Sequence, residues 1–567
     1  MGRTPLEIRQ PTVRKTSCLW LVLAAAAVGL GLIWESIQAS SATYDEATYL
    51  RIAARWWRTG EQSEITRMGS PLLFWKLQQA PVFWLLDQTG RGALIDQPME
   101  HQAELLPLVR AGALWIWLVA LGLCALWSRL LYGPRAMALA AWLFALSPNL
   151  LAHGGLVTME LPLVAGTTGM LLLFWAFLTS GQRRWFWASA ALGGIAFSCK
   201  FTTVLLPPIL AVVWWWDHWG RQESPGWMVL ARRIILGMAA YVAVLVLVDF
   251  VVSDFAVLPL SGTRGHHPTI EARFSSGLGP WIARLYEIPI PQDWVGLANQ
   301  MHHQASGGPS YLLGERRLTG WRCYYFVALA VKVPLTFWLL LAGRLLLVEG
   351  NEPRRDQVLP ITIGLFLAAT ALGSTRNYGV RYLLPLFPLA IIWVSILAER
   401  VTVRGGLPAS WPGWIVGLGF AGQALAVALV YPHELTYFNA LAGGRWGGRH
   451  VLADSNLDWG QGLKSLAELQ RGEPEYRDLT LFYFGDTEPR YYGVAAKAYV
   501  VDAVDSYSEL PDLHTLTTRY VAVSASLQWG PWGPPGFFAD LNSIPPVRMT
   551  DDTTIAIYLT EELSARR

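Results

Sequence analysis

Long apolar runs alternate with short charged connections along the first 430 residues of the chain. A helix needs about 20 mainly apolar residues to cross a bilayer, and eleven segments approach or exceed that length. The fifth and sixth are short and lie close together, and the last is rich in glycine. We therefore expect a polytopic α-helical membrane protein with about 11 transmembrane helices: 18–38, 107–128, 136–152, 160–179, 186–199, 203–217, 232–253, 322–342, 358–373, 380–398 and 411–430.

The lysines and arginines between these segments predict the orientation of the chain. Connections on one side each hold at least two of them, including Arg14 and Lys15, whereas the connections 149–159 and 199–202 together hold a single lysine. Because positive charge stays on the cytoplasmic side, we expect a cytoplasmic N-terminus and an extracytoplasmic C-terminal region. One alternative concerns the first span alone: the basic pair, a short apolar core and the small residues 39–42 could form a cleaved signal peptide.

Two loops on the outer side are long enough to carry structure of their own. The loop 40–106 contains helical patterns at 44–58 and 70–87, and the loop 254–320 is rich in Gly and Pro. We assign both loops to a transmembrane domain that covers residues 1–430.

The region 431–567 has a different pattern, with short runs of β-branched and aromatic residues. The runs at 479–484, 520–524 and 554–559 predict strands, and 460–470 predicts a helix. We expect a small extracytoplasmic α/β domain here. No internal repeat is evident, which weakens the case for a transporter built from inverted repeats.

Composition agrees with a membrane location. The chain is 53% hydrophobic and 15% charged, against about 25% charged in a typical soluble domain. Its 29 Trp and 20 Tyr suit aromatic belts at both membrane surfaces. A net charge of +3 does not argue for nucleic acid, and the four cysteines have neither a disulfide pattern nor metal-ligand spacing.

The clearest candidate for chemistry follows the first span directly, where Asp45 and Glu46 are adjacent carboxylates at the start of a helix. Thr43 and Glu46 have the spacing of a capping box, so a structural role explains Glu46. Asp45 is not needed for the cap. The helix 44–58 is amphipathic, and we expect it to lie in the membrane interface. Its apolar face (Tyr49, Ile52, Ala53 and Trp56) would then meet lipid and its basic stripe (Arg51, Arg55 and Arg58) would meet water.

A carboxylate pair at this place resembles the Asp-Glu motif of the integral-membrane GT-C glycosyltransferases, and more narrowly family 39, the protein O-mannosyltransferases and the bacterial lipid A aminoarabinose transferases. Further segments resemble the outer loops, the late span and the C-terminal domain of that family in the same order: Ser147–Glu160, Cys199–Thr202, Tyr311–Glu315, Tyr325–Pro334, Asn377–Pro385 and Asp454–Gln461.

The resemblance implies transfer of a sugar from a polyprenyl-phosphate donor to an acceptor hydroxyl on a glycan, lipid or protein, at a bacterial inner (plasma) membrane. A carboxylate must take the hydroxyl proton, so the catalytic candidates are Asp45, Glu46 and Glu160. Many relatives carry Asp where this chain has Glu160, so the extra methylene group displaces this carboxylate from the place of theirs. The class rests on the resemblance, because composition and topology alone indicate a membrane protein with charged groups facing outward.

The departing phosphate calls for cations. Candidates are Arg381 and Lys332, charges placed against the apolar or positive-inside trend, and Lys200, for which snorkelling to the interface is the alternative. Tyr44, His153, His266 and His267 are candidates for the donor or acceptor pocket. The cofactor stays open: relatives differ in their need for a divalent metal, and no ligand set stands out here.

Two other functions remain. A transporter or flippase of an amphipathic lipid would place paired charges near mid-bilayer on broken helices, whereas these carboxylates cluster at one interface. A non-catalytic glycan-binding membrane protein would tolerate the loss of the Asp45 carboxylate.

Overall fold

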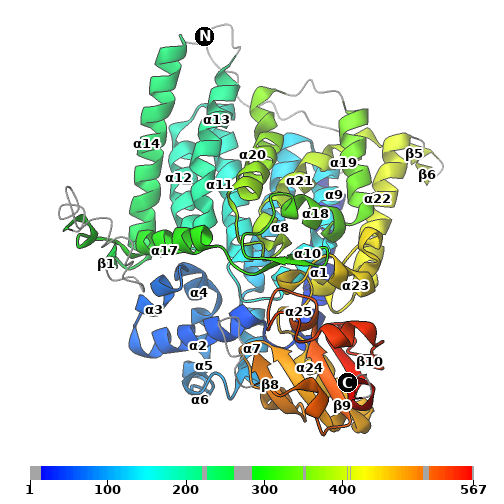
Figure 1. The fold of residues 1–567 in the computed structure, drawn as a ribbon. Helices are drawn as coiled ribbons and strands as arrows, with labels where there is room; N and C mark the ends of the chain where they lie inside the picture. Colours follow the sequence, from blue (N-terminus) through cyan, green and yellow to red (C-terminus); the bar gives the residue numbers. More distant parts are fainter. Residues whose placement is uncertain are drawn as a thin grey trace.

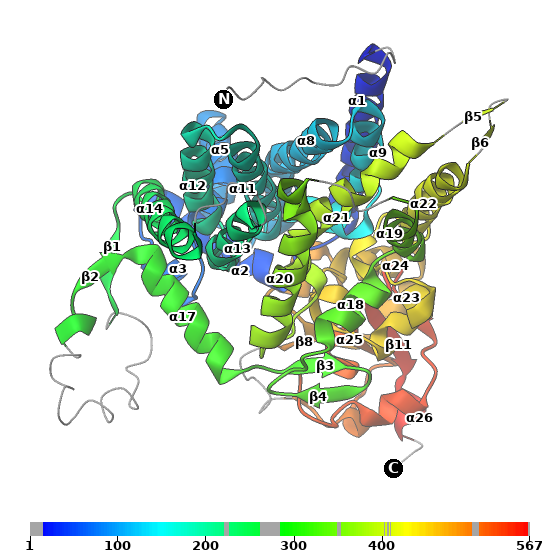
Figure 2. The ribbon, with the colours of Figure 1, turned by 90° about the horizontal axis from the view of Figure 1, so that it is seen from above.

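The computed structural model describes residues 15–219, 226–260, 284–348 and 353–564, except 402, 405–406, 409 and 502–509. Long helices form a bundle that makes up one end of the molecule, and a small sheet with short helices makes up the other (Figure 1). Seen from above, the long helices lie side by side in more than one layer (Figure 2). The largest cluster of buried apolar side chains lies within this bundle.

Six helical stretches among the described residues are long and apolar enough to cross a membrane, or up to eight if each of two bent helix pairs counts as one span. The bent pairs are α9 (Pro134–Ala145) with α10 (Pro148–Gly154), at 64°, and α18 (Tyr324–Lys332) with α19 (Leu335–Leu347), at 104°. The chain is thus an integral membrane protein. The six stretches are built from α1 (Lys15–Ala39), α7 (Gln102–Gly112) with α8 (Leu114–Leu131), α11 (Glu160–Ser180), α14 (Trp227–Val252), η3 (Arg354–Gln357) with α20 (Val358–Gly373), and α22 (Trp411–Ala428).

The expected number of 11 transmembrane helices is not confirmed. Each of the eleven predicted segments contains a helix, but three of those helices have 15, 13 and 10 residues, short of the usual minimum of about 17 for a straight span. These are α12 (Arg183–Phe197), α13 (Leu206–His218), which follows η1 (Phe201–Leu205), and α21 (Leu386–Ser395), which lies between η4 (Val380–Leu383) and η5 (Ile396–Arg400).

Glycines let neighbouring helices of the bundle approach closely. A Cβ atom on Gly194 in α12 would lie 2.6 Å from the carbonyl oxygen of Leu245 in α14, and one on Gly166 in α11 would lie 2.7 Å from the Cβ of Ala196. Small residues at such crossings allow the backbone contact that drives helix association in lipid. The α11–α12–α14 layer therefore depends on these two glycines.

The first long loop folds into short helices beside the end of the bundle. Helix α2 (Tyr44–Thr59) begins with the predicted capping box, in which the Thr43 side chain and the Glu46 side chain each bind the other's backbone N–H. The remaining helices of this region are α3 (Ser63–Arg67), α4 (Leu73–Gln78), α5 (Ala80–Gln88) and α6 (Ala93–Asp96).

The apolar face of α2 meets protein, not lipid, so that expectation is wrong. Tyr49, Ile52 and Ala53 are buried, and the Tyr49 ring contacts the rings of Phe74 and Trp75 at centroid distances of 5.2 and 5.5 Å. The physical reason is that an amphipathic pattern states only that one face is apolar; here α4 and α5 cover that face.

The second long loop contributes two antiparallel strand pairs and one helix. One pair joins β1 (Val257–Pro259) to β2 (Pro289–Pro291), which are far apart in the chain, and the other is the hairpin of β3 (Ser310–Leu312) with β4 (Glu315–Arg317). Helix α17 (Gln292–Ser306) lies between the two pairs along the chain. A further antiparallel pair, β5 (Val403–Arg404) with β6 (Leu407–Pro408), precedes α22.

The C-terminal sheet has the order β10-β11-β9-β7-β8, in which β7 is parallel to both β8 and β9 and the other pairs are antiparallel. The three predicted strands and the predicted helix are present. Two apolar clusters, one on each face, cover the sheet. The elements are α23 (Gly444–Gly447), η9 (Asp454–Asn456), α24 (Leu463–Gly472), β7 (Leu479–Phe484), β8 (Lys497–Val501), β9 (Tyr520–Ser524), α25 (Ala525–Gln528), β10 (Arg548–Met549), β11 (Ile555–Leu559) and α26 (Thr560–Ser564). Short 3-10 turns connect them: η6 (Glu434–Thr436), η7 (Ala440–Ala442), η8 (Gly448–His450), η10 (Pro474–Arg477), η11 (Pro489–Tyr492), η13 (Leu513–Thr515) and η14 (Ala539–Ser543).

Backbone hydrogen bonds join this sheet region to the start of α2. Ser41 donates its backbone N–H to the carbonyl of Gln461 at 3.0 Å, and Tyr44 donates to the carbonyl of Trp459 at 2.7 Å. The segment that follows α1 is thereby fixed against the segment that opens the C-terminal sheet.

We predict that Gly194→Ala destabilises the protein by about 1–3 kcal/mol, the usual cost of overpacking, because the new methyl group would meet the Leu245 carbonyl. Thermal unfolding of the purified protein in detergent measures the effect. Gly122→Ala is the matched control: no atom lies within 4 Å of its would-be Cβ. Equal unfolding temperatures for the two variants would contradict the close approach of α12 and α14.

Candidate functional site

Four charged side chains form a chain of alternating sign where the bundle meets the C-terminal sheet region. Arg381 in η4 donates from Nη1 to Asp45 Oδ2 at 2.7 Å and lies 3.8 Å from Glu160 Oε1. Lys200 donates from Nζ to the same Glu160 oxygen at 2.8 Å. Two carboxylates and two cations thus come together from the start of α2, the start of α11, the loop before η1 and η4.

Aromatic rings cover both cations. The Arg381 guanidinium lies over the Trp459 ring, 4.1 Å from its centroid, and the Lys200 ammonium lies 5.0 Å from the centroid of the Tyr382 ring. Cations are attracted to ring faces within about 6 Å. Trp459 and Tyr382 therefore stabilise the two charges and fix their positions.

Exposure separates the three candidate carboxylates. The Asp45 side chain keeps 22% of its surface exposed, against 2% for Glu160 and 0% for Glu46. Asp45 is thus the carboxylate that a second molecule can reach without rearrangement of the protein.

Glu46 has a structural partner of its own. Arg110 in α7 donates from Nε to Glu46 Oε1 at 2.9 Å and from Nη2 to Oε2 at 2.6 Å, and both side chains are fully buried. Val157 also donates its backbone N–H to Glu46. Burial alone would raise the pKa of the Glu46 carboxyl, but the Arg110 charge and these hydrogen bonds outweigh it and lower the pKa below the usual value. Glu46 therefore anchors the beginning of α2.

Lys332, at the end of α18, is held by backbone carbonyls. Its ammonium donates to the carbonyls of Leu435 at 2.9 Å and Asn456 at 2.6 Å, and lies 4.5 Å from the Phe438 ring centroid. Asn456 in turn accepts from the backbone N–H of Val380, next to Arg381. These three contacts of the Lys332 ammonium are with segments that lead into the C-terminal sheet. Its contact with phosphate stays a prediction.

The four residues predicted to line the donor or acceptor pocket lie in different places. His153 is buried, its ring centroid lies 6.2 Å from that of Trp459, and it is within electrostatic range of Glu160, Arg381 and Lys200. The Tyr44 ring stacks on the ring of Phe484 in β7, with the two ring centroids 5.5 Å apart. His266 and His267 lie outside the described residues.

Several buried polar atoms around the cluster have no hydrogen-bond partner among the described residues: Glu160 Oε2, His153 Nδ1 and Arg381 Nε. Buried polar groups in proteins are usually paired, so unpaired ones at a single site provide hydrogen-bonding capacity for another molecule. No group of three or more His, Cys, Asp or Glu side chains in the described part of the chain is placed to hold a metal ion.

Sequence reasoning missed Trp459, Tyr382 and Arg110. Trp459 stands in the Asp454–Gln461 segment and Tyr382 directly follows Arg381, so their nearness to notable residues was a signal, but nothing local showed which ring lies against which cation. Next to Trp459, burial raises the pKa of the Asp458 carboxyl to about 7 even though it accepts backbone N–H bonds from Ser526 and Gly460. These bonds fix the loop that carries Trp459.

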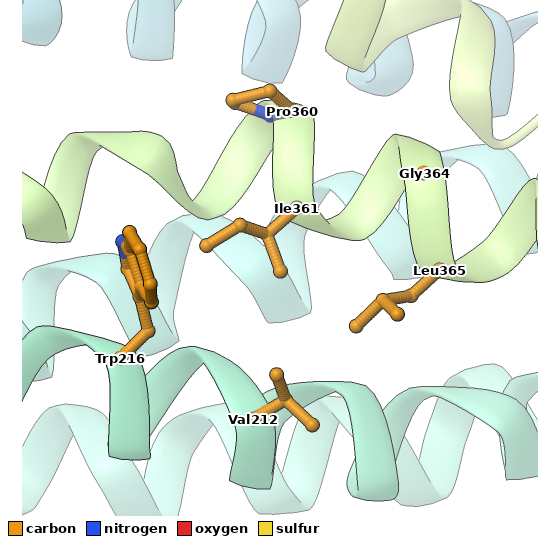
Figure 3. Close-up of a pocket in the computed structure, with 6 residues that line it drawn as sticks. All are labelled: Val212, Trp216, Pro360, Ile361, Gly364 and Leu365. Atoms are coloured by element: carbon orange, nitrogen blue, oxygen red, sulfur yellow. The ribbon is translucent and has the colours of Figure 1, made fainter.

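A separate apolar cavity of about 320 Å³ lies between α13 and α20 (Figure 3). Its lining consists of Val212, Trp216, Pro360, Ile361, Gly364 and Leu365. None of these side chains carries a charge, so this cavity has no group for acid–base chemistry and suits a hydrocarbon chain.

The class of protein is indicated by a family comparison. The family model described as dolichyl-phosphate-mannose-protein mannosyltransferase matches residues 104–252, about a quarter of the chain. The matched part contains Glu160 and Lys200 of the charged cluster. This match confirms the resemblance to the GT-C glycosyltransferases that the sequence motifs indicate.

Particular solved structures are similar to this chain at low identity. ArnT from Cupriavidus metallidurans bound to undecaprenyl phosphate is 14% identical, with a TM-score of 0.47 over 96% of this chain and 98% of that chain. The oligosaccharyltransferase AglB from Archaeoglobus fulgidus, in complex with an inhibitory peptide and a dolichol-phosphate, is 14% identical, with a TM-score of 0.41 over 90% of this chain and 70% of that chain. No curated protein sequence matches the chain.

We predict that Glu46→Gln destabilises the protein by about 3–5 kcal/mol, because it leaves the buried Arg110 charge without its partner. The lowered pKa of Glu46 also sets a pH dependence. Its contribution to the free energy of unfolding is fully present above the unfolded value of about 4.3 and is lost as pH falls toward the folded value. Unfolding temperatures measured between about pH 3 and 7 should converge for wild type and variant at the acidic end.

Glu64→Gln is the control, since Glu64 pairs with the exposed side chains of Arg51 and Arg55 and exposed ion pairs contribute only about 0–1 kcal/mol. A Glu46→Gln variant as stable as Glu64→Gln would show that the buried pair is not an anchor.

Proposed function

We propose that the chain is an inverting glycosyltransferase that moves a sugar from a polyprenyl-phosphate donor to the hydroxyl of an extracytoplasmic glycan, lipid or protein. The observation that carries this proposal is the partly exposed Asp45 carboxylate, paired with Arg381 in a cluster whose other members are less exposed. The family match over residues 104–252 supports the reaction class.

In the proposed reaction the acceptor oxygen attacks the anomeric carbon of the sugar, and Asp45 takes the proton of that hydroxyl. The bond between the anomeric carbon and the phosphate oxygen breaks, and its electron pair leaves with the polyprenyl phosphate. The new bond forms opposite the one that breaks, which inverts the anomeric carbon. A positioned base contributes roughly 10²–10⁴-fold to such a step.

Arg381 and Lys200 would stabilise the negative charge that develops on the phosphate. A guanidinium can bind two phosphate oxygens in its plane, and cations placed in advance stabilise charge at no cost of reorganisation during the reaction. Because Trp459 covers one face of Arg381, the guanidinium would meet the phosphate through its edge. Glu160, held by Lys200, would keep both cations in place, as a positioning residue.

The lysines and arginines between the helices also indicate where the charged cluster lies. We propose that this cluster lies on the extracytoplasmic side of a bacterial inner membrane, with residues 431–567 as a domain on that side and residues 1–430 as the transmembrane domain. The distribution of Lys and Arg between the helices supports this orientation.

Asp45→Asn should lower the transfer rate by at least about 10²-fold, the lower end of a general-base contribution. The assay supplies labelled polyprenyl-phosphate sugars to purified protein and follows label into acceptor. Asp96→Asn is the control, an exposed carboxylate of the same loop paired with Arg58. An unchanged rate in Asp45→Asn would exclude Asp45 as the base.

Arg381→Lys should raise the KM for the donor more than it lowers kcat, because the charge is kept but the planar fork is lost. Arg381→Ala should weaken donor use further. Arg344→Lys is the matched control, since Arg344 is also buried and lies 5.0 Å from a tryptophan ring centroid, that of Trp393. Equal KM values for the Arg381 and Arg344 variants would remove Arg381 from the donor site.

A further inference from the structure

A second cavity, of about 400 Å³, lies where α23 meets the C-terminal sheet region. Its wall includes the rings of Trp446, Trp529 and Tyr558, the Arg449 guanidinium and the amide of Asn542. In Figure 1, α23 lies at the boundary between the long helices and the sheet. Binding sites for small molecules have this size and combine aromatic walls with a few polar groups.

The buried cation is the unusual part of this wall. Arg449 is 5% exposed, and its Nε donates to the carbonyl of Trp446 at 3.0 Å. Its Nη1 contacts the sulfur of Met549 at 3.1 Å, and a thioether is a weak acceptor. No carboxylate within the described ranges forms an ion pair with it. Burial lowers the pKa of Arg449 to about 10, so the guanidinium remains charged at neutral pH.

The aromatic groups are arranged around this charge. The Arg449 guanidinium lies 4.8 Å from the Trp529 ring centroid, and the His450 and Trp529 rings pack edge to face with their centroids 6.0 Å apart. Trp446, which also lines the cavity, keeps 53% of its surface exposed. A ligand in this cavity therefore meets broad flat apolar faces and one guanidinium.

Each feature narrows the class of ligand. A guanidinium in a largely dry site favours carboxylate or phosphate, which it binds in a bidentate geometry. Tryptophan and tyrosine present large apolar faces together with a polar group, and such faces suit the C–H faces of a sugar ring. Asn542 and Ser543 also line the cavity. The Asn542 amide oxygen accepts from Gln528 at 3.2 Å, which leaves the amide NH2 group and the Ser543 hydroxyl to bind sugar hydroxyls.

We propose that this cavity binds an anionic sugar residue of the acceptor, with its acidic group on Arg449 and its ring against Trp446 or Trp529. That the sugar belongs to the acceptor rests on the proposed glycosyl transfer; that the cavity binds an acidic sugar does not. The acceptor would then be a glycan held at two points, at this cavity and at Asp45.

A short stretch of chain links the cavity to the charged cluster: Arg449 lines the cavity, and Trp459, ten residues later, covers Arg381. Between them, Asp454 accepts a hydrogen bond from Trp532 at 2.7 Å. Trp532 also lies 5.8 Å from Tyr378, three residues before Arg381. Binding at the cavity is thus placed to select the acceptor without contact with the reacting atoms.

The test measures binding to the full-length Asp45→Asn protein, which removes turnover from the result. The probes are a hexuronate trisaccharide, its carboxyl-reduced neutral counterpart, inorganic phosphate, and nanodiscs with or without anionic phospholipid. We expect the acidic trisaccharide to bind at least about tenfold more tightly than the neutral one, the size of a charge-assisted hydrogen bond. Arg449→Gln should remove most of that preference.

Trp446→Ala keeps the proposal testable if Arg449→Gln does not fold, because Trp446 is exposed. It should weaken binding of the acidic trisaccharide about tenfold, whereas Trp411→Ala, an exposed tryptophan at the start of α22, should not. Equal affinity for both trisaccharides, or competition by phosphate or anionic phospholipid alone with no contribution from the sugar, would overturn the proposal. Preference for the acidic trisaccharide together with unchanged transfer in Asp45→Asn would support this inference and contradict the proposed function. Loss of transfer together with equal affinity for both trisaccharides would support the proposed function and overturn this inference.

Discussion

The charge of Arg381 is the constraint around which the site is organised. A cation removed from water costs free energy unless opposite charges or aromatic faces compensate it. Here the compensation comes from Asp45 at the start of α2, Glu160 at the start of α11 and Trp459 at the start of the C-terminal sheet region. These three segments must therefore meet at one place, and the place where they meet is the candidate site.

The adjacent carboxylates illustrate how one helix start can serve two purposes. Glu46 points to Arg110 and closes the capping box, so it is neutralised and buried. Asp45, one residue earlier, points to Arg381 and keeps part of its surface exposed. Neighbouring residues on a helix point about 100° apart, so fixing Glu46 also fixes the direction of Asp45. The buried anchor and the proposed base are thus adjacent residues of one dipeptide.

Local patterns predicted much of this structure. The capping box, the strands 479–484 and 520–524 and the apolar segments could all be read from neighbouring residues. Arg110, Tyr382 and Trp459 could not be assigned partners, because their contacts join residues far apart in the chain, as between Arg381 and Asp45, which are 336 residues apart. The lipid-facing side of α2 was predicted wrongly for the same reason: periodicity shows an apolar face, and tertiary packing decides what covers it.

The distance along the chain between the two ends of the charged cluster has a consequence for biosynthesis. The ribosome delivers Asp45 long before Arg381, and Trp459 later still, so a nascent chain carries its acid for most of translation without the cation that completes the cluster. A partly made chain in the membrane would lack the cation that the proposed reaction assigns to the donor phosphate. The cluster would be complete only after the last third of the polypeptide, which carries both Arg381 and Trp459, has folded back onto the first fifty residues.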